Sequence, residues 1–454
     1  MLSTAQKIAS NTFYTSMSGI GIRVFSLVGY FLIIAKLSVF DFGIVALLFT
    51  ALGPSSAIVF LGLDKIFISE VARSCGEKRY RRALKLIQDF CLLVLILSSL
   101  LILGTFLFKN IIGQYFDFLF FQYYWLVVIF VLSQFVLNVA LLILGSHEDF
   151  KSISKLEYLE SFCRVLLIAI FWGQLSIGTV VLAYALAKFI VAFLAIPKVF
   201  KIIKNLLNLS RTQTENRVLY GIIKKFAKWE ILTNFLNQSV APFRLWVIKI
   251  FINVESVAYY DFAENIYGLF VSLVPLRKVV FPAISRNIHN PALVRMIIMK
   301  ARKYLLLFYM VLSLIVLIFT PVFVQTFFPA YSQSIFLVYL HSIRLFLDVF
   351  SLGQSSLIYA FRKLKFRFAM EILSIILLVF YYITFVKTLG LIGGVIGGEL
   401  LIITMVIIKE WYLERKLKFK TWRFAEFLRY DKYDQMIIQL IKNSFLKFFR
   451  AVKV

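Results

Sequence analysis

Residues 118–146, FLFFQYYWLVVIFVLSQFVLNVALLILGS, contain no Asp, Glu, Lys or Arg. A helix needs about 20 residues to cross roughly 30 Å of hydrocarbon, so this stretch is long enough to span a membrane. Because lipid offers no partners for open backbone groups, such a run is expected to be helical. Comparable uncharged runs occupy residues 42–63, 90–108 and 304–328.

The composition of the whole chain agrees with a membrane protein. Hydrophobic residues make up 61% of the 454 residues, and the mean hydropathy is +0.88, whereas soluble domains are about 45–50% apolar. These values predict an all-α polytopic membrane protein with twelve transmembrane helices. The predicted spans are residues 14–35, 42–63, 86–108, 120–144, 160–174, 178–196, 229–250, 256–276, 304–328, 335–360, 368–387 and 391–410.

The distribution of basic residues predicts the orientation of these spans. Of the 50 Lys and Arg residues, 42 fall in the two tails and in the junctions after even-numbered spans. Because Lys and Arg stay on the cytoplasmic side during insertion, both termini are expected in the cytoplasm. The net charge of +27 would suggest nucleic-acid binding in a soluble protein, but loop charge of this kind faces anionic lipid head groups. We therefore expect membrane lipids, and no nucleic acid, as partners.

The widest charged break falls after the sixth span and divides the chain into two groups of six. The break predicts an N-terminal lobe at 1–197, an inter-lobe linker at 198–228 and a C-terminal lobe at 229–413. A basic amphipathic cytoplasmic tail, with the pattern of a helix at the membrane surface, is predicted at 414–454.

The two halves also resemble each other in spacing. Gly43 after the first span corresponds to Ala258, and Gly145 at the end of the fourth span corresponds to Ala360, each 215 positions later. Each half has an even number of spans, so the copies share one orientation in the membrane. Parallel repeats are typical of transporters, which hold their substrate between the halves near the bilayer midplane.

Basic residues inside the spans are the first candidates for a substrate site. An Arg or Lys at a helix centre costs about 2.5–3.5 kcal/mol, so each needs a partner or a water-filled cavity. Spans one and seven begin the two halves, so Arg23 and Arg244 are expected to face the central gap from opposite sides. Cations on both walls would attract a multiply charged anion, and the planar guanidinium suits phosphate. The predicted substrate-binding residues are Arg23, Arg244, Lys188, Arg344 and Lys249.

Acidic residues inside the spans are the candidates for ion coupling. They are Asp261 and Glu264 in span eight, Asp348 in span ten and Glu399 in span twelve. Structural readings stay open for most of the buried charges. Arg344 and Asp348 lie one helical turn apart and could neutralise each other.

Three further structural readings concern single residues. Lys188 could snorkel or pair with Glu399. The acids of span eight could hold Arg244 instead of an ion. Lys249 could be a simple charge at the external rim.

The sequence contains no motif typical of an enzyme. Cys75, Cys91 and Cys163 are scattered without CxxC spacing and are expected to be free thiols. Metal-ligand spacing, a Gly-rich phosphate loop and hydrolase motifs are all missing from the sequence. We therefore predict a protein that is not an enzyme, without a metal or another cofactor.

Five short motifs resemble those of one transporter superfamily. Residues 37–43 (LSVFDFG) and 254–260 (VESVAYY) look like the "L…(D/E)-F-G" junctions of polysaccharide flippases. Residues 281–285 (FPAIS) resemble their "F-P-x-(L/I)-S" motif, and residues 328–331 (FPAY) resemble "F-G-x-x-Y" with Pro for Gly. Residues 389–397 (LGLIGGVIG) look like "G-(I/L)-x-G-A-A". The chain is similar to the multidrug/oligosaccharidyl-lipid/polysaccharide (MOP) exporter superfamily, in its polysaccharide and O-antigen flippase branch.

The resemblance implies a fold and a function. Two six-helix lobes, as in the MATE transporters of the superfamily, would enclose a cavity that opens alternately to each side. The implied activity is translocation of a polyprenyl-diphosphate-linked oligosaccharide from the inner to the outer leaflet for cell-surface polysaccharide assembly. The implied location is the cell (inner, cytoplasmic) membrane, with polysaccharide polymerase or ligase proteins as candidate partners. Arg23 is the best positional match to the cationic cavity residues of the family.

Two other functions are compatible with parts of the sequence. A MATE-type cation or drug antiporter would carry an acidic residue in its first span, where this chain has Arg23 and no acid. A membrane scaffold for glycan-assembly enzymes would depend on the loops and the tail, and it would tolerate changes at Arg23 and Arg244. Since no nucleotide-binding motif is present, transport would draw on an ion gradient, the membrane potential or consumption of the product.

Overall fold

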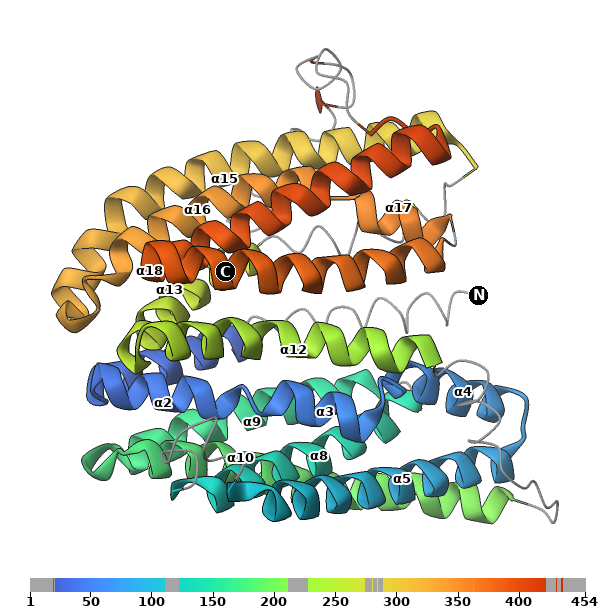
Figure 1. The fold of residues 1–454 in the computed structure, drawn as a ribbon. Helices are drawn as coiled ribbons and strands as arrows, with labels where there is room; N and C mark the ends of the chain where they lie inside the picture. The colour runs from blue at the N-terminus through green and yellow to red at the C-terminus, as the bar shows by residue number, and fades with distance from the viewer. Residues whose placement is uncertain are drawn as a thin grey trace, which may run out of the picture. The chain divides into compact units, whose positions relative to one another are not determined.

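The fold is helical throughout the part of the chain that the structure describes. A computed structural model describes residues 19, 21–110, 122–147, 149–210, 228–273, 280, 284, 289–361, 363–421, 430 and 434–435 (Figure 1). All regular elements in these ranges are α-helices or short 3₁₀ turns. Within these ranges, seven helices are long and apolar enough to cross a membrane.

Helical segments cover most of the described part of every predicted span. Several helices begin well before the predicted apolar run, namely α5 at Tyr80, α9 at Phe150 and α15 at Pro291. The early turns carry the basic residues of the predicted cytoplasmic junctions, which water can solvate while the backbone keeps its helical bonds. Hydropathy marks only the apolar part of such a helix, so these three helices begin earlier in the sequence than the predicted spans. The count of twelve spans and the cytoplasmic termini stay predictions.

The chain forms two compact units. Unit 1 comprises Met1–Asp261 and Thr326–Tyr331, and unit 2 comprises Phe262–Gln325 and Ser332–Val454. Helix α12 (Lys228–Phe251) belongs to unit 1, where it packs on α2 and α3. The Trp246 indole of α12 donates a hydrogen bond of 3.0 Å to the Thr50 hydroxyl. The two lobes inferred from the repeat stay a prediction.

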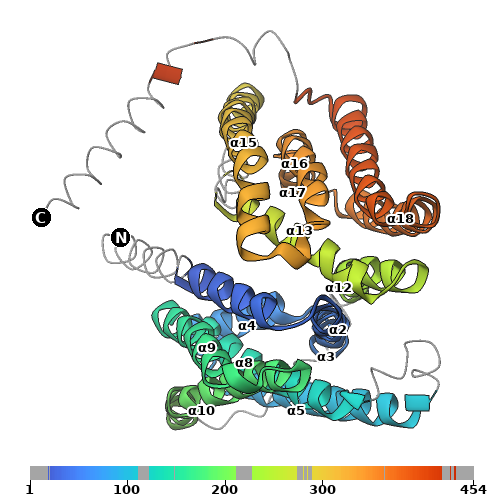
Figure 2. The same ribbon diagram turned by 90° about the vertical axis from the view of Figure 1, so that its left-hand side faces the viewer.

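Unit 1 is a bundle in which α10 packs along α8 and α9 (Figure 2). A helix through residues 21–36 opens the described part of this unit. The remaining elements are α2 (Val39–Phe49), α3 (Leu52–Phe60), α4 (Asp64–Gly76), α5 (Tyr80–Leu107), α8 (Tyr124–Ser146), α9 (Phe150–Ile170), η1 (Trp172–Gln174), α10 (Ile177–Leu209), α12 and η3 (Pro329–Tyr331).

One core cluster of unit 2 lies between α15 and α16. It consists of aliphatic side chains and the ring of Tyr309. Helix α13 (Val254–Leu273) begins in unit 1 and ends in unit 2. The other elements of unit 2 are α15 (Pro291–Phe327), α16 (Ser334–Ser351), α17 (Gln354–Ala360) and α18 (Leu364–Leu417).

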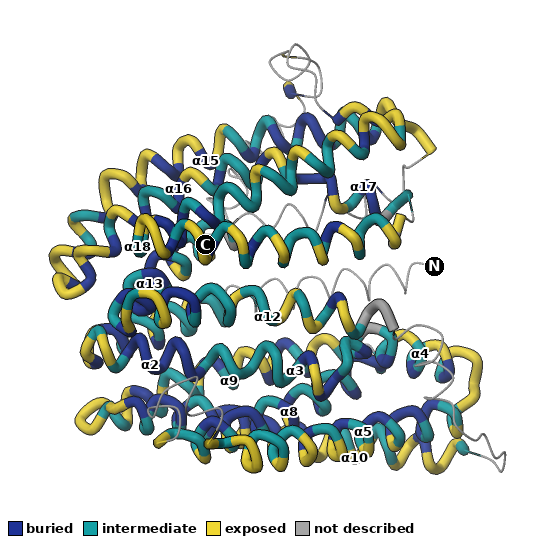
Figure 3. The backbone as a smooth tube through the Cα atoms, viewed as in Figure 1, coloured by how far each residue is buried: buried dark blue, intermediate teal, exposed yellow. Residues whose placement is uncertain are grey.

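Exposed residues recur along several helices (Figure 3), and many of them are large and apolar. Leu95 on α5, Phe193 on α10 and Phe319 on α15 are 62%, 72% and 63% exposed. Contiguous apolar surface of this kind marks a membrane or partner interface in proteins. Together with the long uncharged helices, these faces identify a multi-pass membrane protein.

The predicted repeat recurs in the helix starts. Helix α2 begins at Val39 and α13 begins at Val254, 215 positions later. Both starts carry the same kind of cap, because the Ser38 hydroxyl accepts from the Asp41 amide and the Asn253 side chain accepts from the Ser256 amide. Side-chain caps satisfy amides that have no partner within the helix.

Gly390 divides α18 into two helices. Its φ of 63° and ψ of −139° are non-helical and suit glycine. Beyond it, Gly393 and Gly397 lie against the carbonyls of Phe385 and Tyr381, so the second helix packs back along the first. Small residues four apart allow two membrane helices to approach closely. Predicted spans eleven and twelve are therefore the two arms of this hairpin.

A polar network ties the end of α18 to α15 and α16. The buried Arg302 guanidinium donates to the Leu352 carbonyl at 3.0 Å and to the Phe350 carbonyl at 2.7 Å, which satisfies the C-terminal end of α16. It also donates to the Thr421 hydroxyl at 3.0 Å, and that hydroxyl donates to Glu410. The network fixes residues 418–421 within unit 2.

Parts of four predictions lie outside the described residues. They are most of the linker between the lobes (211–227), most of the FPAIS motif, the first predicted span before residue 19, and most of the tail after Thr421. In the described part of the tail, Asp434 is fully buried and accepts from Lys300 at 2.6 Å and from Tyr304 at 2.7 Å.

Candidate functional site

A buried cation lies in the interior of unit 1. The side chain of Lys188 on α10 is 6% exposed, and its ammonium lies 4.1 Å from the centre of the Phe130 ring on α8. The ring of Tyr184, one turn earlier on α10, lies 5.5 Å from the same ammonium. Within the described ranges these two aromatic faces are its direct contacts, and no carboxylate lies within ion-pair distance, although Glu160 is close enough to attract the ammonium electrostatically. Aromatic faces stabilise a desolvated cation by about 2 kcal/mol, less than a full ion pair with hydrogen bonds.

A second cation shares the Tyr184 ring. The guanidinium of Arg164 on α9 lies 4.9 Å from the centre of that ring. Arg164 donates a hydrogen bond of 2.9 Å to the Ser26 hydroxyl in the helix through residues 21–36. Its other contact is Glu160, one turn earlier, at 3.6 Å. We call Ser26, Glu160, Arg164, Tyr184 and Lys188 the cation cluster.

The electrostatics of the cation cluster favour an anion. It holds two cations and one carboxylate, and the side chains of Arg164 and Glu160 are only 14% and 13% exposed. Charges repel or attract more strongly in a low-dielectric interior than in water. A ligand with two or more negative charges would therefore be stabilised here, and the planar guanidinium of Arg164 is suited to pairing with two oxygens of such a ligand.

Sequence analysis identified Lys188 but missed Arg164 and Glu160. Arg164 was counted with the basic residues of the cytoplasmic junction at 146–164, although it also falls in the predicted span 160–174, and Glu160 at the start of that span was not selected. The structure starts α9 at Phe150, after an Asp149 cap that accepts from the Ser152 amide at 3.1 Å. The cap residue and the Glu160–Arg164 spacing of one turn are signals that predict an earlier helix start.

The other predicted cations of unit 1 occupy helices near its surface or its edge. Arg23 is half-buried in the helix through residues 21–36, and Arg244 is half-buried on α12. Lys249 lies over the Trp246 ring at 5.6 Å near the end of α12. The Tyr30 hydroxyl lies 3.5 Å from the Asp261 carboxylate, where unit 1 ends. Whether Arg23 and Arg244 face one cavity stays a prediction.

A second polar cluster lies in unit 2 and contains three predicted residues together with Tyr267. Arg344 on α16 lies 3.8 Å from Glu264 on α13, and its guanidinium lies over the Tyr267 ring at 4.7 Å. The Tyr267 hydroxyl donates a hydrogen bond to the Asp348 carboxylate. Arg344 and Asp348, one turn apart, thus each have a partner on α13.

Glu399 lies beside a histidine that the sequence analysis did not select. The Nδ1 atom of His341 on α16 lies 3.8 Å from the Glu399 carboxylate on the second arm of α18. The side chains are 2% and 12% exposed. Lys188 contacts aromatic rings of unit 1, and Glu399 contacts His341 of unit 2. The residues predicted for ion coupling are therefore divided, with Asp261 in unit 1 and the other three in unit 2.

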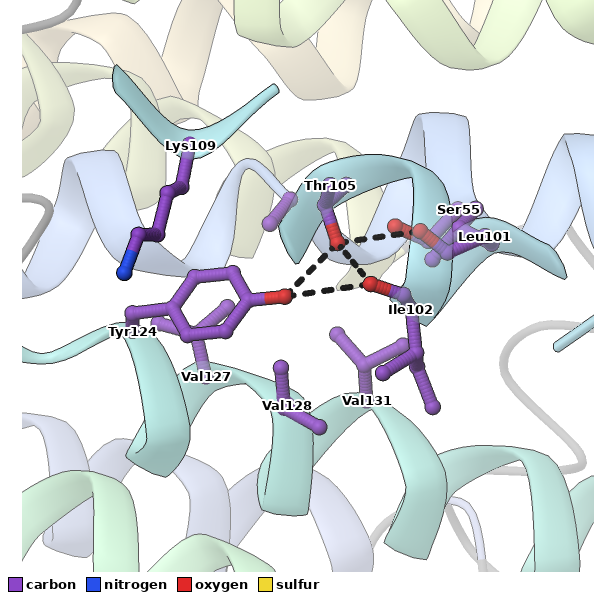
Figure 4. A pocket seen from close by; sticks show the side chains of 10 residues that line it. Ser55, Leu101, Ile102, Thr105, Lys109, Tyr124, Val127, Val128 and Val131 are labelled. Carbon is purple, nitrogen blue, oxygen red and sulfur yellow. Dashed lines mark hydrogen bonds between the residues drawn. The ribbon is translucent and has the colours of Figure 1, made fainter. Parts of the chain in front are cut away.

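A separate cavity of ≈ 80 Å³ lies between α3, α5 and α8 in unit 1 (Figure 4). Its walls are aliphatic apart from the Ser55, Thr105 and Tyr124 hydroxyls and Lys109. The Thr105 and Tyr124 hydroxyl oxygens are 3.0 Å apart. None of the predicted site residues lines this cavity. Its size suits a few methylene groups and not a sugar.

The family of the chain follows from its sequence. A family model described as "Polysaccharide biosynthesis protein" matches residues 8–288. The chain belongs to this family. Its match covers more than half of the chain, including all described parts of unit 1 up to Asp261. No curated protein sequence matches the chain closely enough to count as a relative.

Solved structures with the same fold are members of the MOP superfamily. The lipid II flippase MurJ in an inward closed conformation has a TM-score of 0.71 at 16% identity, over 95% of this chain and 93% of that chain. A multidrug resistance MATE family transporter in an inward-facing conformation has a TM-score of 0.67 at 17% identity, over 87% and 96%. A MOP superfamily transporter from Pyrococcus furiosus, described as having a binding pocket of reverse polarity, has a TM-score of 0.64 at 15% identity, over 91% and 95%.

These findings confirm the resemblance that the motifs indicated. The chain belongs to the polysaccharide biosynthesis family, and its fold is that of the MATE transporter and of the flippase MurJ. At 15–17% identity the solved structures establish the fold alone.

Proposed function

We propose that this protein is a flippase that moves polyprenyl-diphosphate-linked oligosaccharide from the inner to the outer leaflet of the cell (inner) membrane. The family of the chain and its MOP-type fold support a transporter in polysaccharide biosynthesis. The observation that carries the substrate class is the cation cluster, in which Arg164 and Lys188 share the face of Tyr184.

A diphosphate is the chemistry that this cluster suits. Two cations near one aromatic ring repel each other, and a ligand with two phosphate groups would neutralise both. The Arg164 guanidinium offers paired donors to phosphate oxygens, whereas Lys188 acts as a point charge. Without a ligand, the Glu160 carboxylate would offset part of the positive charge of the cluster. When the diphosphate binds, Arg164 would exchange its contact with Glu160 for contacts with phosphate oxygens.

The physical need for such a protein follows from the substrate. Moving a charged diphosphate and several sugars through hydrocarbon is prohibitive, because even one unpaired charge costs several kcal/mol. A hydrated cationic path lets the head group cross while the polyprenyl chain stays in lipid. Alternating access between the two faces of the membrane would complete the cycle.

Roles for the other predicted residues belong to this proposal. Beside Lys188, the cations Arg23, Arg244, Arg344 and Lys249 would line the path of the head group, with Lys249 at its external rim. Asp261, Glu264, Asp348 and Glu399 would serve ion coupling. Twelve spans with cytoplasmic termini, O-antigen or capsule-like polysaccharide as the product and polymerase or ligase proteins as partners complete the proposal.

The alternative functions have less support. A cation or drug antiporter needs an acidic cavity, whereas the buried cluster of unit 1 carries excess positive charge. A scaffold without transport activity needs no membrane-embedded cations at all. Burying Lys188 without a carboxylate partner is costly, and a binding role explains why the chain keeps it.

The test is the location of the lipid-linked oligosaccharide in cells that lack this protein. We expect the precursor to accumulate on the cytoplasmic leaflet and to return to normal with the wild-type protein. The double variant Arg164→Gln/Lys188→Met should restore protein levels but not transport. The variant Arg23→Ala/Arg244→Ala tests the predicted path in the same way.

Two results would change this conclusion. A normal precursor distribution in cells without the protein and without a second flippase would exclude the flippase function. Full rescue by Arg164→Gln/Lys188→Met would keep the function but exclude the cation cluster as the diphosphate site. Loss of rescue on truncation of the tail alone would favour the scaffold.

A further inference from the structure

The start of α15 holds a carboxylate from the tail of the chain. Asp434 is fully buried, and its Oδ2 atom lies 2.6 Å from the Lys300 ammonium and 3.3 Å from the Lys303 ammonium. The Tyr304 hydroxyl donates a hydrogen bond of 2.7 Å to Oδ1 of the same carboxylate. All four residues belong to unit 2. We call Lys300, Lys303 and Tyr304 the anion cradle.

The donors of the anion cradle are of the kind that hold phosphate. Two ammonium groups and one phenol hydroxyl converge on one carboxylate, and the side chains of Lys300 and Lys303 are only 11% and 16% exposed. Lysine binds phosphate as a point charge with three donors, so the cradle does not require the planar shape of a carboxylate. A phosphate group, which also presents charged acceptor oxygens, therefore suits the same donors.

The cradle lies where α15 passes from basic to apolar sequence. Residues 291–303 contain four basic residues and no acidic one, whereas residues 304–328 contain no charged residue. Leu307 and Val311, both exposed, follow Lys303 at steps of four residues and so share its face of α15. In a membrane protein such an apolar face lies in hydrocarbon, and Lys303 lies about 6 Å before Leu307 along the helix. Lys303 is therefore at the depth of the lipid head groups.

Asp434 binds the cradle as a tethered ligand. It follows Thr421 by 13 residues, and the Thr421 hydroxyl accepts a hydrogen bond of 3.0 Å from the buried Arg302. Arg295 donates to the Lys420 carbonyl at 2.9 Å, so the chain is fixed to α15 before it reaches Asp434. Tethering keeps the carboxylate at a high effective concentration near the cradle. A competing anion must therefore itself be concentrated at this place, as the phosphates of membrane lipids are.

The charge of the tail makes the contact sensitive to anionic lipid. Residues 435–454 contain four basic residues and no acidic one. Because the start of α15 is basic as well, the carboxylate of Asp434 offsets repulsion between the two segments. Basic segments are also attracted to the surface of an anionic membrane. Anionic lipid therefore competes for both partners of the contact, with its phosphate for the cradle and with its surface for the basic tail.

We propose that the anion cradle is a binding site for the phosphate of an anionic phospholipid, and that Asp434 competes with the lipid for this site. The tail is bound while the carboxylate occupies the cradle, and it is released when a head group takes its place. The contact is thus a switch that responds to the lipid composition of the membrane. It does not depend on the transport substrate proposed above, because no residue of the cation cluster takes part.

Retention of phosphatidylglycerol by the full chain tests the competition. The protein is reconstituted in bilayers of phosphatidylcholine and phosphatidylglycerol and extracted with detergent, and its bound lipids are counted by native mass spectrometry. We expect Asp434→Asn to retain severalfold more phosphatidylglycerol than the wild type, because it removes the competing carboxylate. Lys300→Gln/Lys303→Gln should retain severalfold less. Equal retention by the wild type and Asp434→Asn would overturn the proposal.

Charge-matched variants outside the cradle separate a specific site from an effect of net charge. Glu414→Gln removes one negative charge at a half-exposed position near the end of α18, and Lys416→Gln/Lys420→Gln removes two exposed positive charges nearby. Both should retain the wild-type amount of lipid. A gain in Glu414→Gln as large as in Asp434→Asn would show that net charge alone attracts the lipid, and the cradle would be refuted as its site.

Release of the tail is measured as a distance between two spin labels. In a cysteine-free background, the labels are attached at Ala292→Cys and Gln435→Cys, both at exposed positions. We expect a narrow distance distribution in phosphatidylcholine bilayers and a broad one once phosphatidylglycerol is added. Asp434→Asn should give the broad distribution in both lipids, so this result does not require the double lysine variant to fold.

The source of the phosphate is tested with the same labels. Inorganic phosphate added to the protein in phosphatidylcholine bilayers should leave the distribution narrow, since a soluble anion is not concentrated at the cradle. If inorganic phosphate releases the tail as completely as phosphatidylglycerol does, the lipid head group is wrong as the ligand. A distribution that stays narrow in phosphatidylglycerol would exclude the switch itself.

Discussion

The ammonium of Lys188 lies 4.1 Å from the centre of the Phe130 ring, deep between α10 and α8. A lysine in this position depends on an aromatic face for part of the stabilisation that water would otherwise provide. The membrane interior therefore keeps a positive charge that folding alone does not require.

Replacing Lys188 should separate stability from transport. We expect Lys188→Met to fold with equal or higher thermal stability, because removing a buried charge relieves its desolvation. The same variant should lose transport of lipid-linked oligosaccharide in complemented cells. Lys109→Met is the control, since Lys109 also lies over a ring, that of Phe106 at 5.0 Å, but outside the cation cluster. Normal transport by Lys188→Met would contradict a substrate role.

Replacing the guanidinium of Arg164 with an ammonium should weaken diphosphate binding. Arg164→Lys keeps the charge but loses the paired donors and the contact with Ser26 at 2.9 Å. A charged hydrogen bond contributes about 1.5–3 kcal/mol, so binding of undecaprenyl diphosphate should fall about tenfold or more. The affinity is measured by titrating the protein with undecaprenyl diphosphate and following tryptophan fluorescence. Arg73→Lys, on the exposed end of α4, is the control. Equal affinities for wild type and Arg164→Lys would count against bidentate binding.

Gly393 should tolerate no side chain. A Cβ at this position would overlap the Phe385 carbonyl oxygen, so Gly393→Ala must push the two arms of α18 apart. Overpacking of this kind costs about 1–3 kcal/mol. Thermal unfolding in detergent should show a lower midpoint than the wild type. Gly104→Ala on α5, where nothing lies within 4 Å, should show no loss, and equal losses at both sites would refute the close packing.

Breaking the Arg302 network should destabilise unit 2. Arg302→Met leaves Glu410 without its nearby cation and leaves the Phe350 and Leu352 carbonyls without a donor. Removing one partner of a buried network costs about 3–5 kcal/mol. We expect a large drop in the thermal midpoint and earlier proteolysis after residue 417. Arg73→Gln, which breaks only the exposed contact with Glu77, should behave like wild type.

Sequence reasoning reached the family, and of the cation cluster it selected Lys188 alone. Lys188 was recognisable because it interrupts an apolar run. Arg164 and Glu160 were not selected, because they lie at the polar start of the predicted span 160–174, whereas α9 begins earlier, at Phe150. Partners also differed from the expected ones, since Glu399 lies beside His341 and Arg344 lies beside Glu264.

The sequence by itself determined that this protein is a helical, multi-pass membrane protein. Uncharged runs such as residues 118–146 permit little else, because lipid leaves no partner for an open backbone, and the basic residues indicate the expected orientation. Only the tertiary structure decided which buried charges meet. Spacing along the chain shows which residues share one side of a helix. It does not show which residues of other helices contact that side, because each helix could be rotated about its own axis. Packing of α9 on α10 brought Arg164 and Lys188 to one ring, and packing of α18 on α16 brought Glu399 to His341.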